Sequence, residues 1–202
     1  MFVDVSSLDR AAVYRLMIGA IVPRPIAWVG SARADGTDNL APFSYFMGVQ
    51  SEPPLLAISV AKGRGGALKH TARNVLETRE FTVSVVEEPH LEAMHVSGGS
   101  WAESEFDVTG LARAPGERVA APWVRDARVA LECRLAHALD LGQAHLIVGE
   151  VVGVHVDETL VVDGTPVLAG LRPVARLGGD DYATLGRVVS RPRVRVDPAK
   201  SS

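Results

Sequence analysis

The chain has 202 residues, 47% of them hydrophobic, and a formal net charge of −3. This length fits one domain with a single core, and the small negative charge argues against nucleic acid as a partner, because nucleic-acid-binding proteins usually gather Lys and Arg on one face. The N-terminal segment contains acidic residues and no long apolar run, so we expect no signal peptide, no membrane span and a cytoplasmic location.

The first expected element is a short helix. Ser6 or Ser7 is expected to cap a helix over residues 8–16. Pro23 and Pro25 then mark the edge of the first strand, since proline cannot donate a hydrogen bond to the middle of a sheet.

A β-hairpin is predicted next. Ile26–Ser31 and Thr37–Ala41 flank a turn at Gly36, where glycine allows a positive φ without a steric penalty. Residues 55–60 are apolar on both faces, which indicates an interior strand of a barrel or sandwich.

The middle of the chain mixes helical and extended patterns. We expect, in order, a helix over 67–78, a strand over 81–86, a short helix over 89–96 and a long polar connection over 97–122. A connection of that length is more often functional than idle.

Strand patterns dominate the last third of the chain. Strands are expected over 127–136, 145–156, 161–162 and 167–168, with bends at Gly149 and Gly153. Cys133 falls on the apolar side of the first of these strands, so we expect a core residue. The pattern predicts a mainly β fold, an antiparallel barrel with a few short helices, in one domain over residues 1–190 and a flexible tail over 191–202.

A basic, glycine-rich loop suggests a phosphate site. Lys62, Arg64, Lys69 and His70 lie within nine positions of one another, ahead of a helical pattern. Cations beside the free N–H groups of a helix N-terminus hold a phosphate well. A solvated loop with incidental cations is the alternative, and the loop matches neither the P-loop nor the dinucleotide fingerprint.

A second polar segment lies next to aromatic residues. The segment 39–44 offers an amide, a hydroxyl and backbone groups that suit the edge of a flavin ring, and the chain supplies apolar walls nearby in Trp28, Phe43, Tyr45 and Phe46. Taken one at a time, each of these aromatics is better explained as a core residue.

Several motifs together resemble the flavin reductase-like family of FMN-binding split-barrel proteins, and most of all its flavoredoxin-related branch. They are Pro23-Arg24-Pro25-Ile26-Ala27-Trp28-Val29, Asn39-x-Ala41-Pro42-x-Ser44-x-Phe46, Pro53-Pro54, Lys69-x-Thr71-x-x-Asn74, His145 to Val151, and Arg176-Leu177-Gly178-Gly179-x-x-Tyr182. The family commonly has Lys-Asp-Thr where this chain has Lys69-His70-Thr71.

The resemblance implies a six-stranded antiparallel Greek-key split barrel that forms a homodimer and binds FMN. It implies a cofactor site made of Trp28, Val29, Gly30, Ser31, Asn39, Ala41, Pro42, Phe43, Ser44, Ser59, Val60, Lys62, Lys69, Thr71 and Asn74, with Tyr182 closing over it.

The expected activity is that of an oxidoreductase in which NAD(P)H passes hydride to flavin N5. Two alternatives remain: a flavin-binding electron carrier that does not use NAD(P)H, and an oxidase of a small molecule. No catalytic residue is assigned; His145 is a candidate, although a strand-end His bonded to a backbone carbonyl is the simpler interpretation. His90 and His95 lack the spacing of a zinc pair, so no metal is expected.

Overall fold

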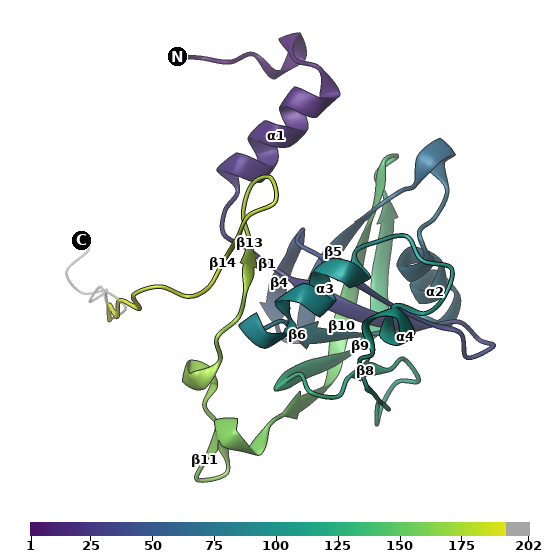
Figure 1. Cartoon of the computed structure of the whole chain (residues 1–202), viewed down its shortest axis with the longest axis vertical. Coiled ribbons are helices and arrows are strands. Elements are labelled where there is room, and N and C mark those ends of the chain that lie inside the picture. Colours follow the sequence, from purple (N-terminus) through teal and green to yellow (C-terminus); the bar gives the residue numbers. More distant parts are fainter. Residues whose placement is uncertain (193–202) are drawn as a thin grey trace, which may run out of the picture.

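Seven antiparallel strands form one curved sheet, in the order β3-β2-β6-β9-β10-β5-β4, in the computed structural model, which describes residues 1–192 (Figure 1). They are β2 (Ala27–Ala32), β3 (Asp38–Phe43), β4 (Phe46–Ser51), β5 (Pro54–Ala61), β6 (Glu80–Val85), β9 (Val129–Asp140) and β10 (Ala144–Val156). Only Ser44 and Tyr45 separate the two edge strands, β3 and β4, so the sheet curls until its edges meet. The mainly β barrel prediction is confirmed, although the sheet has seven strands because β4 was not predicted.

Smaller sheets surround this barrel. A three-stranded sheet joins β1 (Arg24–Pro25), β13 (Ala175–Arg176) and β14 (Tyr182–Ala183), and two-stranded sheets pair β7 (Arg113–Ala114) with β8 (Trp123–Val124) and β11 (Val161–Val162) with β12 (Thr165–Pro166). Short 3-10 turns lie at Val5–Ser7, Arg64–Gly66, Glu88–His90, Glu158–Leu160 and Leu168–Gly170. In the three-stranded sheet, β13 from the C-terminal part of the chain pairs with β1 from its N-terminal part.

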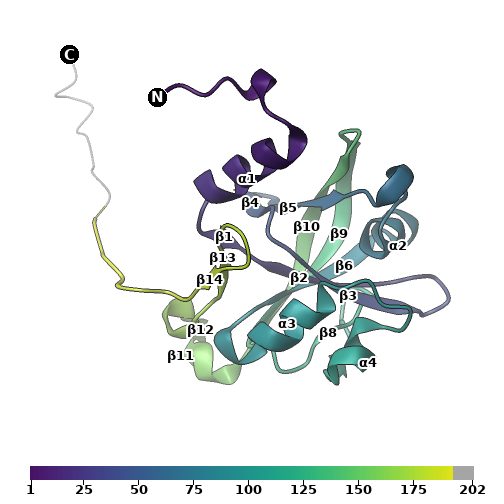
Figure 2. The same cartoon turned by 45° about the horizontal axis from the view of Figure 1, so that its top comes forward.

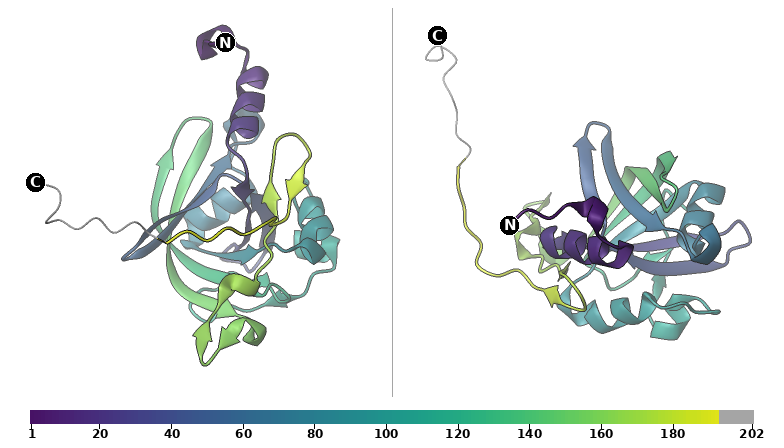
Figure 3. Two further views of the ribbon diagram at one scale, coloured as in Figure 1. Left: turned by 90° about the vertical axis from the view of Figure 1, so that its left-hand side faces the viewer. Right: turned by 90° about the horizontal axis from the view of Figure 1, so that it is seen from above.

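Helix α1 (Arg10–Ala20) extends away from the barrel (Figure 3). Its N-cap is Asp9, whose carboxylate accepts a 2.7 Å hydrogen bond from the backbone N–H of Ala12, so the predicted cap at Ser6 or Ser7 was wrong. Asp9 is the N-cap because the N-cap residue directly precedes the first helical residue, which here is Arg10. Ile18 alone in this helix is buried.

Helices α2 (His70–Thr78), α3 (Leu91–Ser97) and α4 (Glu105–Thr109) pack directly on the barrel (Figure 2). Helix α2 begins three residues later than predicted, because the backbone is still extended at Ala67 and at the N-cap residue Lys69. Its residues Ala72 and Val75 are buried, as its apolar face predicts.

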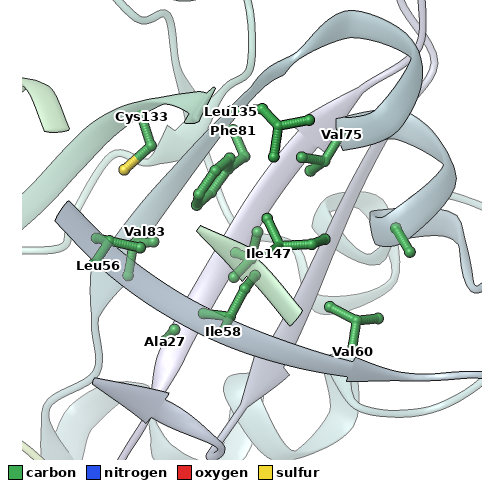
Figure 4. Close-up of a cluster of buried hydrophobic side chains, with 12 residues drawn as sticks. Ala27, Leu56, Ile58, Val60, Val75, Phe81, Val83, Cys133, Leu135 and Ile147 are labelled. Atoms are coloured by element: carbon green, nitrogen blue, oxygen red, sulfur yellow. The ribbon is translucent and has the colours of Figure 1, made fainter. Parts of the chain in front are cut away.

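The core lies in two clusters on opposite faces of β2. Ala27 and Val29 point into the barrel, where Ile58, Phe81 and Ile147 meet them (Figure 4). The alternating neighbours Ile26 and Trp28 point outward, against Met94 of α3 and Phe106 of α4, because successive side chains of a strand face opposite sides. The barrel therefore has an inner core and a second core under its helices.

Cys133 belongs to the inner cluster, as predicted. It is fully buried, and burial followed by the charge of Glu132 raises the pKa of its thiol far above the usual value. The group stays a thiol and packs as a small hydrophobic side chain.

The predicted hairpin and the predicted bends are confirmed. Strands β2 and β3 pair in register from Ala27 with Phe43 to Ala32 with Asp38, across a turn where Gly36 has φ 87°. The register between β9 and β10 shifts at both Gly149 and Gly153. At Gly149 a Cβ atom would lie 2.4 Å from Cζ of Phe81, so only glycine lets that ring pass.

Two predictions in the connections were wrong. The segment 97–122, predicted as a long polar connection without a helix or strand assigned to it, contains α4 and β7, and the strand expected at 167–168 lies at Thr165–Pro166. The predicted tail lies outside the described residues except for positions 191 and 192. None of the helices within residues 1–192 is both long enough and apolar enough to span a membrane.

Candidate functional site

Two adjoining cavities open at the seam where β3 leads into β4. Their volumes are about 450 Å³ and about 470 Å³, a size typical of small-molecule sites. Pro42, Phe43, Lys69 and Gly98 line both cavities, so the two form one continuous groove. Because β3 is an edge strand, its free side faces this groove, and Pro42 is tolerated there since an edge position needs no N–H donor.

The first cavity gathers residues from distant parts of the chain. Its walls come from α1, the β3–β4 corner, β5, α3 and the C-terminal sheet: Tyr14, Ile18, Ile26, Phe43, Ser44, Tyr45, Ser59, Ala61, Met94, His95, Arg176, Gly179 and Tyr182. Phe43, Ser44 and Ser59 are among the predicted cofactor residues, and Tyr182, which the resemblance placed over the cofactor, also lines this cavity.

The second cavity lies at the start of α2. It is lined by Asn39, Ala41, Leu68, His70, Thr71, Arg73, the segment 98–102 and Glu105. The Nδ2 group of Asn39 donates a 2.9 Å hydrogen bond to Oγ1 of Thr71, which leaves the hydroxyl proton of Thr71 free to donate to a ligand.

Helix α2 presents an anion seat to this second cavity. The N–H groups of its first turn have no intrahelical acceptor, and the helix dipole places partial positive charge there. Lys69 is the N-cap residue and forms no side-chain cap, and His70 and Arg73 stand on the same wall. The seat therefore combines backbone donors, one hydroxyl and cationic side chains, which is the donor set that a phosphate monoester requires.

Glu105 is an unexpected carboxyl group in this cavity. It is 5% exposed, and its Oε2 accepts a 2.9 Å hydrogen bond from the backbone N–H of Leu40 on β3. Burial raises its pKa, and the hydrogen bond from Leu40 only partly offsets that effect. Glu105 thus accepts a hydrogen bond from the backbone N–H of Leu40, which has no neighbouring strand on the free edge of β3.

Arg24 holds the walls of the first cavity together. Its buried guanidinium donates to the backbone oxygens of Ile18, Ile21 and Leu177 at 2.6, 2.9 and 2.8 Å, and to Oγ of Ser44 at 3.3 Å. One side chain therefore joins the end of α1, the β3–β4 corner and the C-terminal segment.

Five predicted cofactor residues support the fold instead of lining the groove. Trp28 is fully buried and donates from Nε1 to Oγ of Ser97 at 2.8 Å, so its ring is not a free wall for a ligand. Val29 and Val60 belong to the inner core. Asn74 donates from Nδ2 to Oγ of Ser31 at 3.2 Å, and this buried pair ties α2 to β2.

Gly30 also has a packing role. A Cβ atom at this position would lie 2.0 Å from the backbone oxygen of Pro122 and 2.6 Å from Oγ1 of Thr82. Glycine is required because the segment that ends at Pro122 crosses β2 at this point.

Lys62 and His145 lie outside both cavities. The Nζ atom of Lys62 is 2.8 Å from each carboxylate oxygen of Asp140, so this lysine already has an anionic partner. The Nε2 atom of His145 is 3.8 Å from Oδ2 of Asp140, and its Nδ1 is buried without a hydrogen-bond partner among the described residues, so the expected carbonyl bond is not seen. The groove is therefore built without the candidate catalytic histidine.

Several lining residues were missed from the sequence, among them Tyr14, Arg73, His95 and Trp101. Tyr14, His95 and Trp101 come from α1, α3 and the segment after α3, which contain none of the recognised motifs, and Arg73 is an unspecified position within the motif Lys69-x-Thr71-x-x-Asn74. Among residues 1–192, no cluster of three or more His, Cys, Asp or Glu side chains is placed to hold a metal ion.

Comparison with known proteins identifies the class of protein. The flavin reductase like domain family matches residues 18–169. A relative from Halalkalibacterium halodurans, the uncharacterised protein BH2278, is 39% identical over 201 residues, covering 96% of this chain and 96% of its own. This chain belongs to the flavin reductase-like family.

Solved structures agree with that assignment. Nitrilotriacetate monooxygenase component B from Bacillus cereus is 34% identical, with a TM-score of 0.90 over 95% of this chain and 98% of that one. A putative flavin reductase with a split-barrel domain from Shewanella frigidimarina is 24% identical, with a TM-score of 0.83 over 96% and 100% of the two chains. The second comparison bears on the fold alone: the barrel described above is a split barrel.

Proposed function

We propose that this protein binds FMN in the seam groove and acts as an NAD(P)H-dependent flavin reductase. The observation that carries the proposal is the anion seat at α2, joined through shared walls to a cavity of apolar and hydroxyl groups. FMN has the same two parts, a phosphate and a flat ring. Family membership supports a flavin ligand independently.

The phosphate would lie in the second cavity. Lys69 Nζ, the Thr71 hydroxyl and the first N–H groups of α2 would hold it, with Arg73 adding positive charge and His70 lying on the same wall. Asn39 fixes the Thr71 hydroxyl through their 2.9 Å hydrogen bond. Lys62 is not needed for this role, since Asp140 neutralises it.

The ring would lie along the β3–β4 corner, where Ala41, Pro42 and Phe43 supply apolar contact and Ser44 supplies a hydroxyl. When bound, FMN would supply the hydride and electron chemistry, so the chain needs no nucleophile of its own. The protein's tasks are then to bind, to orient and to exclude water. Tyr14, Met94 and Tyr182 would enclose the remaining space, in which a nicotinamide would bind.

An anaerobic mixing experiment separates a reductase from an electron carrier. Protein loaded with FMN is mixed with NADH or NADPH, and the flavin absorbance band is followed. Rapid bleaching with either nucleotide is the result expected of a reductase. An FMN complex that forms but does not bleach would instead support the flavoredoxin-like carrier, and a protein that takes up no FMN would refute both roles.

We also propose that the protein is a homodimer. Large apolar side chains stay exposed on α1, at Ile21 directly after it and on β4, including Tyr14, Met17, Met47 and Val49. A second copy of the chain is the partner that would cover them, because large exposed apolar side chains are commonly buried at interfaces between identical subunits.

A further inference from the structure

The first cavity carries positive charge that FMN does not require. Its charged lining residues are Arg24, Lys69 and Arg176, and no Asp or Glu of the described chain lines it. The proposed phosphate seat uses Lys69 together with the cations of the second cavity. Arg176 is left in the same cavity as Phe43 and Ser44 without a role.

Arg24 does not explain this surplus. Its guanidinium is 4% exposed and donates to three backbone carbonyls and to Ser44. With four acceptors already in place, Arg24 adds to the electrostatic field of the cavity but has little capacity to bind a ligand directly.

Arg176 is better placed to bind one. Its guanidinium carbon lies 4.4 Å from the centre of the Tyr182 ring, and its Nη2 donates a 2.6 Å hydrogen bond to the backbone oxygen of Gly179. Within residues 1–192 its only carboxylate partner is Asp180, whose Oδ1 is 3.9 Å from Nη2 of Arg176 and whose side chain is fully exposed. An exposed pair at that distance is weak, so Arg176 keeps donors available for a stronger anionic partner.

Tyr182 and His95 fix the position of this arginine. The Tyr182 hydroxyl is 3.2 Å from Nδ1 of His95, and the two rings meet edge to face at 6.2 Å. The chain of contacts from α3 through Tyr182 to Arg176 is a wall that we call the Arg176 wall (His95, Arg176 and Tyr182). It offers a planar aromatic surface beside a fork of N–H donors.

We propose that the Arg176 wall binds the anionic group of a second ligand, a carboxylate or a phosphate monoester, whose planar part stacks in the first cavity. The proposal rests on the proposed FMN site and names the class of molecule that exchanges electrons there. Such an anion could belong to an aromatic carboxylic acid or to the 2′-phosphate of NADPH. Both present oxygen atoms that a guanidinium holds with two hydrogen bonds.

The test is calorimetric titration of the full chain, with and without bound FMN. Benzoate is compared with its neutral isostere benzamide, and adenosine 2′-phosphate with adenosine. We expect at least one anion to bind at least tenfold more tightly than its neutral counterpart, equivalent to about 1.4 kcal/mol. The pair that shows the preference identifies the source of the anion.

Variants test whether the Arg176 wall causes the preference for an anion over its neutral counterpart. Arg176→Gln is expected to remove it, Arg176→Lys to retain part of it, and Arg134→Gln to leave it intact. Arg134 is exposed on β9, where it donates to the backbone oxygen of Arg118, so its substitution removes the same charge elsewhere. Circular dichroism confirms that each variant is folded.

The inference fails if neither anion is preferred by the wild-type chain, or if Arg176→Gln and Arg176→Lys both keep the full preference in a folded protein. Failure of the FMN proposal would be seen separately, as the absence of a bound flavin spectrum in the same wild-type sample. Because the titrations are also run without FMN, the anion preference is measured in either case.

Discussion

Glu105 connects a titratable group to the edge of the proposed phosphate site. Burial raises its pKa above the usual 4.5, so folding favours its protonated form. The stability that this group contributes is therefore fully present below the usual carboxyl pKa and is lost as the pH rises through the raised value. Ionised Glu105 would also repel a phosphate in the second cavity.

We predict that Glu105→Gln becomes relatively more stable as the pH rises. The amide oxygen still accepts the hydrogen bond from Leu40 but cannot ionise. The difference in free energy of unfolding between variant and wild type should thus grow as the pH rises above the usual carboxyl pKa, as measured by urea unfolding over a series of pH values. Glu103→Gln, an exposed neighbour, is the control. A difference for Glu105→Gln that stays constant with pH would contradict the prediction.

Individual residues also show where sequence reasoning stops. Crowding of aromatics around the segment 39–44 suggested that Trp28 faces a ligand, yet its partner is Ser97, which lies 69 positions further along the chain. Lys62 looked like a phosphate ligand because it lies in the basic, glycine-rich loop, yet its partner Asp140 is 78 positions away. Local patterns do not reveal such long-range pairs, whereas the position of Lys69 and Thr71 at the start of a helix could be predicted because it depends on neighbouring residues alone.

Among the larger elements, the segment between β7 and β8 depends on one buried carboxylate. Glu132 on β9 is 1% exposed and accepts hydrogen bonds from the backbone N–H groups of Glu117, Arg118 and Val119 at 2.8, 2.6 and 3.0 Å. Burial acts to raise its pKa, but these donors and His155 outweigh burial, so the pKa of Glu132 is lowered. A charge held in this way stabilises the whole segment.

Glu132→Gln should lower the free energy of unfolding by about 3 kcal/mol near neutral pH, because an amide replaces the charge and turns an N–H group toward other N–H donors. Chemical denaturation measures the change. Glu150→Gln, on the exposed side of β10, should stay within about 0.5 kcal/mol of wild type. The loss of stability caused by Glu132→Gln should become smaller as the pH falls through the lowered pKa of Glu132, because the wild-type carboxylate is then protonated as well. Equal stability of the two variants at neutral pH would show that the hydrogen bonds from residues 117–119 to Glu132 do not stabilise the fold.

Strands and hairpins were the elements that the sequence predicted best. The alternation and the turn at Gly36 identify β2 and β3, and the glycines of β10 identify its bends. Helix α4 was missed because it has only five residues and takes its stability from neighbours, and strand β4 was missed because its residues lie at the sheet edge, are mostly exposed and lack an alternating apolar pattern. In α4, for example, Glu105 bonds to Leu40 of β3.

For the whole molecule, the apolar surface of α1 and β4 predicts a dimer. Ultracentrifugation of the wild-type chain should give twice the mass of 21.5 kDa. Met47→Glu should shift the equilibrium toward monomer, since Met47 is 59% exposed on β4. Val162→Glu, at a position 55% exposed on the distant β11–β12 hairpin, should leave the mass unchanged. A wild-type chain that sediments as a monomer would contradict the prediction.

The split-barrel class could be predicted from the order of motifs, but the groove could not be assembled from them. Its first cavity needs Tyr14 of α1 and Arg176 of β13 side by side, and the buried guanidinium of Arg24 brings these ends together. That junction depends on main-chain carbonyls, which carry no sequence signal.

The central claim is that the α2 N-terminus holds the phosphate of FMN, and the dissociation constant of FMN in two lysine variants tests it most directly. Lys69→Gln should weaken FMN binding about tenfold, because it removes one charge-assisted hydrogen bond, while riboflavin binding should hardly change. Lys62→Gln, whose lysine is paired with Asp140, should stay within about twofold of wild type for both ligands. Loss of FMN affinity in Lys62→Gln with Lys69→Gln unaffected would place the phosphate elsewhere and contradict the account.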